Sequence, residues 1–133
     1  MQDQNPTDVI SPKILLVVDD EKMNRFLLRK MVEQDGYTVI EANDGKEAVK
    51  EVHLHSFAVV LMDVRMPNMD GLEASSIISK EFPRLPIIVI TAEPLEVIAG
   101  EGRRSGVDAF LSKPVHKVDL LDMIKKTIAS KSS

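Results

Sequence analysis

Short apolar runs alternate along the chain with longer segments in which apolar residues recur every three or four positions. Residues 14–18, 57–62 and 87–90 form unbroken apolar runs. Each run is too short for a buried helix and suits a strand that is covered on both faces. Two weaker segments, 38–42 and 109–112, also predict strands, the first because its first half is β-branched and the second because it follows a glycine turn. The pattern therefore predicts five strands in a parallel sheet.

Helical periodicity fills the segments between these strands. The clearest pattern places four apolar side chains on one face of a helix: Met23, Phe26, Leu27 and Met31. The last pattern has an i, i+3, i+7 spacing at Leu121, Ile124 and Ile128. Because strands and helices alternate throughout, right-handed crossovers would wind the chain into a doubly wound α/β sandwich.

One helix is predicted to be short or mobile. It follows Thr91 and opens at Pro94, and it contains Gly100 and Gly102. Each glycine in a helix interior costs about 1 kcal/mol relative to alanine. This segment therefore has the weakest intrinsic tendency of the five to form a helix.

Length and patterning predict one domain with one core. The chain has 133 residues, and apolar periodicity begins near residue 13 and ends near residue 129. We expect a domain over residues 13–129, a flexible N-terminal tail over residues 1–12 and a C-terminal tail over residues 130–133.

Composition narrows the classes of function. The chain has no cysteine, and no apolar run approaches the roughly 20 residues of a membrane span. The polar first dozen residues do not resemble a secretory signal, so we expect a cytoplasmic protein without membrane attachment. The net charge is −4 and no basic cluster occurs, which argues against a nucleic-acid-binding surface.

Three aspartates follow two of the predicted strands. Asp19 and Asp20 end the first strand and Asp63 ends the third. The carboxyl ends of parallel strands meet at one edge of the sheet, where ligands of such folds bind. Carboxylates held this close repel one another unless a cation neutralises them, and hard oxygen ligands suit magnesium. The sequence therefore predicts a magnesium site, with Asp63 as the best-placed carboxylate to accept a phosphoryl group.

Thr91 and Lys113 end the fourth and fifth strands and bring a hydroxyl and a cation to the same edge. Both suit the oxygens of a transferred phosphoryl group. Each residue taken singly also has a structural interpretation, as a helix cap, a turn residue, a strand end or a solvated charge. Their joint placement at one edge favours the phosphoryl-transfer site.

The segments around these residues closely resemble the receiver domains of two-component response regulators. The resemblance covers roughly residues 13–128 and is carried by four segments that occur in order: LVVDD at 16–20, LMDVRMP at 61–67, ITA at 90–92 and FLSKP at 110–114. It implies a flavodoxin-like five-stranded sheet in the order 2-1-3-4-5. It also implies that Asp63 accepts phosphate from a phosphohistidine on a histidine kinase or a His-containing phosphotransfer protein.

The resemblance implies roles for further residues. Asp20, Asp63 and the main-chain carbonyl of Arg65 would bind magnesium directly, and Asp19 would act through water. Lys113 would pair with the phosphoryl oxygens, and the Lys113–Pro114 peptide bond would be cis. Phe110 occupies the position of an aromatic switch, where the ring turns inward as Thr91 moves towards the phosphate; an ordinary core aromatic is the equal alternative.

The resemblance also bears on regulation and partners. Phosphorylation would change most the face formed by strands four and five and helices four and five, and this face would pair with another receiver if the domain forms a homodimer. The segments 19–25 and 62–67 look more like receivers attached to hybrid histidine kinases than like those of transcription factors. The sequence does not name the donor kinase or the downstream protein.

Two other functions are compatible with the fold. An aspartyl-nucleophile phosphohydrolase would turn over small phosphoesters, but the chain lacks the strand-end Asp-x-Asp pair of haloacid-dehalogenase-like phosphatases. A pure interaction module would keep the fold without phosphorylation, and the complete set of site residues argues against it. We therefore expect a phosphoacceptor switch that is not a turnover enzyme.

Overall fold

Strands and helices alternate strictly along residues 13–132, the part of the chain that the computed structural model describes. The tail predicted for residues 1–12 lies outside the described residues. In chain order the elements are β1 (Ile14–Val18), α2 (Lys22–Glu33), β2 (Thr38–Ala42), α3 (Gly45–Val52), β3 (Val59–Met62), α4 (Gly71–Glu81), β4 (Ile87–Thr91), α5 (Leu95–Arg104), β5 (Ala109–Ser112) and α6 (Lys117–Ser132). The fourth and fifth helices along the described chain are thus α5 and α6.

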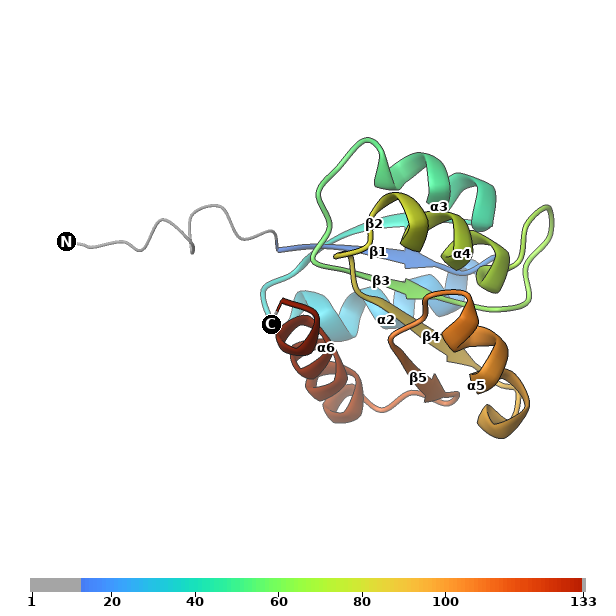
Figure 1. Ribbon diagram of the computed structural model, residues 1–133. Helices are drawn as coiled ribbons and strands as arrows, with labels where there is room; N and C mark the ends of the chain where they lie inside the picture. The colour runs from blue at the N-terminus through green and yellow to red at the C-terminus, as the bar shows by residue number, and fades with distance from the viewer. Residues whose placement is uncertain (1–12, 133) are drawn as a thin grey trace.

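The five strands form one parallel sheet in the order β2-β1-β3-β4-β5, as expected (Figure 1). The register pairs Val18 of β1 with Met62 of β3, and Thr91 of β4 with Ser112 of β5. The end of β1 is therefore level with the end of β3, and the end of β4 with that of β5, so that the residues that follow these strands gather at one edge. The site predicted from the sequence lies at this carboxyl edge.

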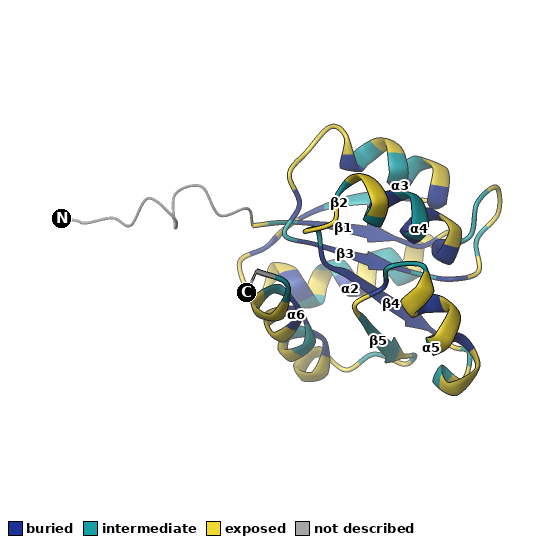
Figure 2. Cartoon of the chain, viewed as in Figure 1, coloured by how far each residue is buried: buried dark blue, intermediate teal, exposed yellow. Residues whose placement is uncertain are grey.

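Helices cover both faces of the sheet and create two cores (Figure 2). On one face α3, α4 and α5 pack on alternate strand residues such as Leu16, Val60 and Val89. On the other face α2 and α6 pack on the intervening residues, including Val17 and Leu61. Strand side chains alternate between the faces, which is why the central strands β1 and β3 are apolar at every position.

Helix α2 forms where the periodicity predicts it, but most of its predicted apolar face lies in solvent. Met23, Phe26 and Leu27 are 65, 49 and 48% exposed, whereas Leu28 and Val32 are buried against the sheet. The helix therefore carries two apolar stripes, one for the core and one that the described chain leaves uncovered. An exposed apolar stripe of this kind marks a binding surface more often than a structural one.

The boundaries that sequence reasoning missed lie at the ends of helices. Helix α5, which the sequence predicts to be short or mobile, spans ten residues in spite of its glycines. Helix α6 continues to Ser132, past the predicted domain end at residue 129, because no glycine or proline stops it and the Lys131 ammonium binds Asp108 at 2.7 Å. No helix among residues 13–132 is long and apolar enough to span a membrane.

Candidate functional site

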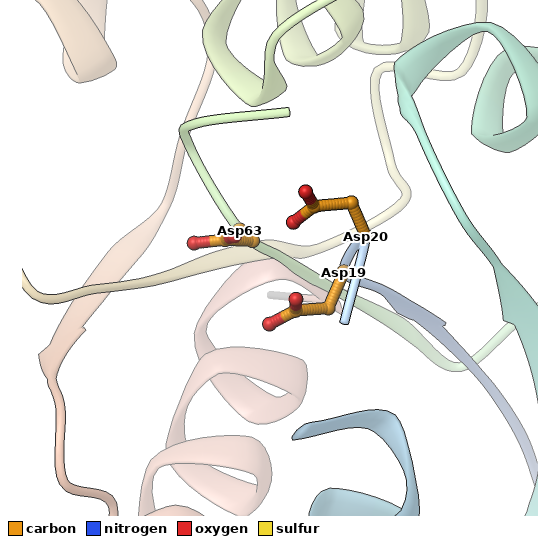
Figure 3. Close-up of side chains that lie close together, drawn as sticks. All are labelled: Asp19, Asp20 and Asp63. Atoms are coloured by element: carbon orange, nitrogen blue, oxygen red, sulfur yellow. The ribbon is translucent and has the colours of Figure 1, made fainter. Parts of the chain in front are cut away.

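Three carboxylates converge at the carboxyl edge of the sheet. Asp19 and Asp20 follow β1 and Asp63 follows β3, and each offers an oxygen that lies within 4.8 Å of the others (Figure 3). The main chain aligns them, since the Asp63 amide donates to the carbonyl of Val18 at 2.9 Å. A set of oxygen donors this close suits a hard divalent cation such as magnesium. The arrangement agrees with the predicted metal site.

Lys113 connects two of these carboxylates. Its Nζ lies 3.3 Å from Asp19 Oδ2 and 3.3 Å from Asp63 Oδ1. The residue follows β5, and its amide donates to the Thr91 carbonyl at 2.8 Å. The Lys113–Pro114 peptide bond is cis, as the resemblance predicted. One cation thus faces three carboxylates, which leaves net negative charge in the cluster.

The surroundings of the cluster shift the pKa values of Asp63 and Lys113. Burial and the neighbouring Asp19 charge raise the pKa of Asp63 above its ordinary value, against the opposing effect of Lys113. Burial lowers the pKa of Lys113, but the carboxylates of Asp63 and Asp19 outweigh it and raise this pKa overall. An added cation beside Asp63 would therefore favour the ionised form of its carboxylate.

Asp19 is buried and tightly held. Its Oδ1 accepts hydrogen bonds from the Glu21 amide at 2.9 Å and from Asn24 Nδ2 at 3.4 Å. Its amide donates to the Ala42 carbonyl of β2 at 3.2 Å. Asp20, in contrast, has an exposed side chain that points towards Asp63 (Figure 3). The pair thus consists of one carboxylate fixed by the protein and one open to a ligand.

The loop after Asp63 is attached to α3 by contacts that sequence reasoning missed. Asn68 has a positive φ of 69°, and its Nδ2 donates to Asp44 Oδ2 at 2.7 Å. Asp44 also caps α3 by accepting from the Glu47 amide. Asn tolerates the left-handed conformation and Asp caps helices, so each residue had a local signal, but their pairing is visible only in three dimensions.

Gly71 lets α4 begin directly against the Asp63 backbone. A Cβ atom at this position would lie 1.9 Å from the Asp63 carbonyl oxygen, so no other residue fits without a shift of the main chain. The Gly71 amide donates to the Val64 carbonyl at 2.8 Å. The start of α4 therefore fixes the backbone of the central carboxylate.

Thr91 lies at the same edge but belongs to a separate set of contacts. It is buried, and its Oγ1 accepts from the Glu93 amide at 3.1 Å. The Arg65 guanidinium forms an ion pair with the Glu93 carboxylate, and Arg65 Nη2 lies 3.1 Å from Glu93 Oε1. The loops after β3 and β4 are thus joined beside the acidic cluster, and Thr91 lies beneath this link.

Phe110 packs partly buried against the core formed by α3, α4 and α5. Its position on β5 pairs with Val89 of β4, two residues before Thr91. The ring rests on α5 at Gly102, where an added Cβ would lie 2.4 Å from Phe110 Cε2. The aromatic residue thus connects β5 to α5, and the arrangement agrees with its role as a core aromatic in this conformation.

A groove opens beside the cluster between α2 and the loop after β5. It has a volume of about 420 Å³. Leu27, Met31 and Val115 contribute apolar walls, and Asp19 and Lys113 lie along the same groove. Leu27, one of the exposed apolar residues of α2, therefore lies in the same groove as Asp19 and Lys113.

The strand order and the acidic cluster with its lysine define a doubly wound α/β domain with a ligand site at the carboxyl edge. Residues 15–125 match the model of the response regulator receiver domain family. Because the match covers most of the chain, the chain belongs to this family. It is a receiver domain of the kind found in response regulators and sensor histidine kinases.

Similar proteins contain this domain in different settings. The chain is 37% identical to the transcriptional regulatory protein PdtaR of Mycobacterium tuberculosis over 92% of its own length and 60% of that protein. It is 39% identical to the sensor histidine kinase RcsC of Salmonella typhimurium over 87% of its length and 12% of that protein. The chain thus spans less than two thirds of these relatives, which include both a regulator and a sensor kinase.

Solved structures confirm the fold. A CheY-like receiver domain protein from Methanospirillum hungatei superposes with a TM-score of 0.85 at 28% identity, covering 92% of this chain and 98% of that one. The receiver domain of the sensor histidine kinase PA1611 from Pseudomonas aeruginosa superposes with a TM-score of 0.82 at 28% identity, covering 89% and 98%. The PA1611 structure has a magnesium ion in its active site cleft.

Proposed function

We propose that Asp63 is the residue that accepts the phosphoryl group. The observation that carries this proposal is the convergence of Asp19, Asp20 and Asp63, with Lys113 bridging Asp19 and Asp63. Asp63 lies at the centre of the edge, directly after β3, and burial together with the Asp19 charge raises its pKa. A bound cation would favour the ionised form of Asp63 and leave one of its oxygens for reaction.

The cation in this proposal is magnesium. Asp20, Asp63 and the Arg65 carbonyl would hold it directly, and Asp19 would hold it through water. Oxygen donors of this kind suit magnesium, and the related PA1611 receiver domain binds it. When bound, magnesium neutralises charge on the carboxylates and on the incoming phosphoryl oxygens.

The transfer itself needs a nucleophile and a stabilised phosphoryl group. An Asp63 carboxylate oxygen forms a bond to phosphorus while the phosphorus–nitrogen bond of a donor phosphohistidine breaks, and the electron pair of that bond returns to the imidazole ring. Lys113 then moves from Asp63 to the new phosphoryl oxygens, and Thr91 donates its hydroxyl to another of them. The product is an aspartyl phosphate on the protein, so the domain is a stoichiometric acceptor and not a turnover enzyme.

Phosphorylation would act as a switch through β4 and β5. The modification adds about −1.5 to −2 charge, and moving Thr91 towards it would break the hydrogen bond from the Glu93 amide. The space vacated lies on the side of the sheet that Phe110 occupies. We propose that the ring then turns inward and alters the surface of α5, β5 and α6, where a downstream protein or a second receiver would bind.

The groove beside α2 is the surface proposed for the donor. A phosphohistidine must reach Asp63, and the groove is lined by Asp19, by Lys113 and by the exposed apolar side chain of Leu27. Apolar exposed surface next to a reactive residue suits a helical partner such as a histidine kinase or a phosphotransfer protein. We place this exchange in the cytoplasm, the compartment that supplies ATP to such kinases.

Intact-mass spectrometry with the small phosphodonor acetyl phosphate tests the proposal. Wild type incubated with the donor and magnesium is expected to gain the mass of one phosphoryl group, and EDTA should abolish the gain. Asp63→Asn should gain nothing. Asp122→Asn, which changes an exposed aspartate on α6, should react as wild type does.

Two results would contradict the proposal. One is equal phosphorylation of Asp63→Asn and wild type, which would place the acceptor elsewhere. The other is an unchanged yield in EDTA, which would remove the metal from the reaction. Circular dichroism of each variant separates a loss of reactivity from a loss of fold.

A further inference from the structure

Arg25 joins three elements next to the acidic cluster. It lies on the first turns of α2, and its Nη1 donates to the carbonyl oxygen of Asp19 at 2.7 Å. Its Nε forms an ion pair with Glu41 Oε1 of β2 at 2.8 Å. The side chain is only 14% exposed. The guanidinium of this α2 residue therefore connects the end of β1 with the edge strand β2.

The carbonyl that Arg25 holds belongs to the peptide unit between Asp19 and Asp20. Because a peptide unit is planar, fixing this oxygen also fixes the direction in which the Asp20 backbone leaves the strand. The preceding peptide unit is held separately, since the Asp19 amide donates to the Ala42 carbonyl. Asp20 itself has an exposed side chain. Arg25 is thus in a position to orient the open carboxylate of the pair without touching it.

The position of Arg25 has two opposite consequences for a cation at this site. As a positive charge near the cluster, Arg25 repels magnesium, so its removal would strengthen magnesium binding. As an anchor of the Asp19–Asp20 peptide, it keeps the ligands in place, so its removal would weaken binding. The sign of the change in affinity therefore separates an electrostatic role from a positioning role.

We propose that Arg25 is a positioning residue that orients Asp20 for magnesium binding. This inference rests on the proposed function, because it assumes that Asp20 is a magnesium ligand. Glu41 holds the other side of the guanidinium, and β2, which contributes no residue to the acidic cluster, thereby supports the site. Groups that orient metal ligands typically influence metal affinity tenfold or more when removed.

Arg29 provides a matched control. It lies one turn further along α2, carries the same charge and pairs with the same Glu41, at 2.7 Å. Its second partner is Glu33, at 2.8 Å, whereas the second partner of Arg25 is the Asp19 carbonyl. Arg25→Gln and Arg29→Gln therefore remove the same charge and one Glu41 pair each. Arg25→Gln also removes the contact with the peptide group between Asp19 and Asp20, whereas Arg29→Gln removes the contact with Glu33.

The test is the affinity of each purified variant for magnesium, measured by isothermal titration calorimetry. Tryptophan is absent and Tyr37 is the only tyrosine in the sequence, so calorimetry is preferred to intrinsic fluorescence. We expect Arg25→Gln to bind magnesium about tenfold more weakly than wild type. Arg29→Gln should bind as tightly as wild type or slightly more tightly. Thermal unfolding without metal should show similar small losses of stability for both.

The outcomes distinguish this inference from the proposed function. If wild type binds magnesium and Arg25→Gln binds it at least as tightly as Arg29→Gln, the positioning role is wrong and the metal site stands. If wild type itself does not bind magnesium, the metal site fails and the inference fails with it. If Arg25→Gln does not fold, Arg25→Lys keeps the charge without the planar fork; an affinity below that of wild type supports the inference, and an equal affinity overturns it.

Discussion

The ionised form of Asp63 is disfavoured in the metal-free domain. Burial and the Asp19 charge raise its pKa, and Lys113, which it shares with Asp19, compensates only in part. A group whose pKa is raised in the folded state favours the fold more when it is protonated. At neutral pH the ionised Asp63 therefore costs stability, and this cost falls as the pH falls towards the raised pKa.

Asp63→Asn is accordingly expected to stabilise the metal-free domain. Asparagine resembles the protonated carboxyl group, so in EDTA at pH 7.5 the variant should gain about 1 kcal/mol, a typical size for a single-residue effect. For a domain of this length the gain corresponds to roughly 4 °C in the unfolding midpoint. The difference from wild type should narrow as the pH is lowered, because Asp63 of the wild type then takes up its proton.

Differential scanning calorimetry at pH 7.5 and at successively lower pH measures the unfolding midpoint of each variant. Asp122→Asn serves as the control, since Asp122 is an exposed residue paired with Lys126, and it should change the midpoint little. A lower midpoint for Asp63→Asn than for wild type at pH 7.5 would show that the Asp63 charge stabilises the fold.

At the scale of elements, α5 contains two glycines with different surroundings. The nearest atom to a Cβ at Gly100 is Arg104 Nη1 at 3.7 Å, which is an ordinary contact. A Cβ at Gly102 would lie 2.4 and 2.6 Å from Cε2 and Cζ of Phe110. Gly100 therefore lowers the stability of the helix without a role in packing, whereas Gly102 makes room for the Phe110 ring.

The two glycine-to-alanine variants should change stability in opposite directions. Gly100→Ala should raise the free energy of unfolding by up to about 1 kcal/mol, the intrinsic helix preference of alanine. Gly102→Ala has the same preference, but the overpacking against Phe110 costs about 1–3 kcal/mol, so the net effect should be destabilising. Urea denaturation of both variants measures the difference.

Phe110→Leu tests whether overpacking against the Phe110 ring causes the loss of stability in Gly102→Ala. In that background the Gly102→Ala substitution should lose its penalty, because the smaller side chain leaves room for the new methyl group. If Gly102→Ala stabilises the domain with Phe110 in place, the ring does not rest on α5 as described.

At the scale of the whole molecule, the sequence was sufficient for the sheet and for the position of the site. Three apolar runs and two weaker segments predicted all five strands, and three strands have the predicted limits: β1 at Ile14–Val18, β2 at Thr38–Ala42 and β5 at Ala109–Ser112. Because parallel strands end at one edge of the sheet, the sequence predicted that Asp19, Asp20 and Asp63 lie together, as they do.

The sequence did not predict which side chains support the site. Arg25 with Glu41, and Asn68 with Asp44, are separated by 16 and 24 residues, and local patterns carry no information about such pairs. The periodicity of α2 likewise marked an apolar face but not its environment, which is solvent for Met23, Phe26 and Leu27. These features depend on how the elements pack against one another.

Locating the modified residue shows whether Asp63 is the acceptor. After reaction with acetyl phosphate and magnesium, sodium borohydride reduces an aspartyl phosphate to homoserine, and peptide mass spectrometry identifies its position. If Asp63 is the acceptor, homoserine is expected at residue 63, with aspartate retained at residues 19 and 20. Homoserine at residue 19 or 20, or a phosphorylated chain without homoserine at residue 63, would contradict it.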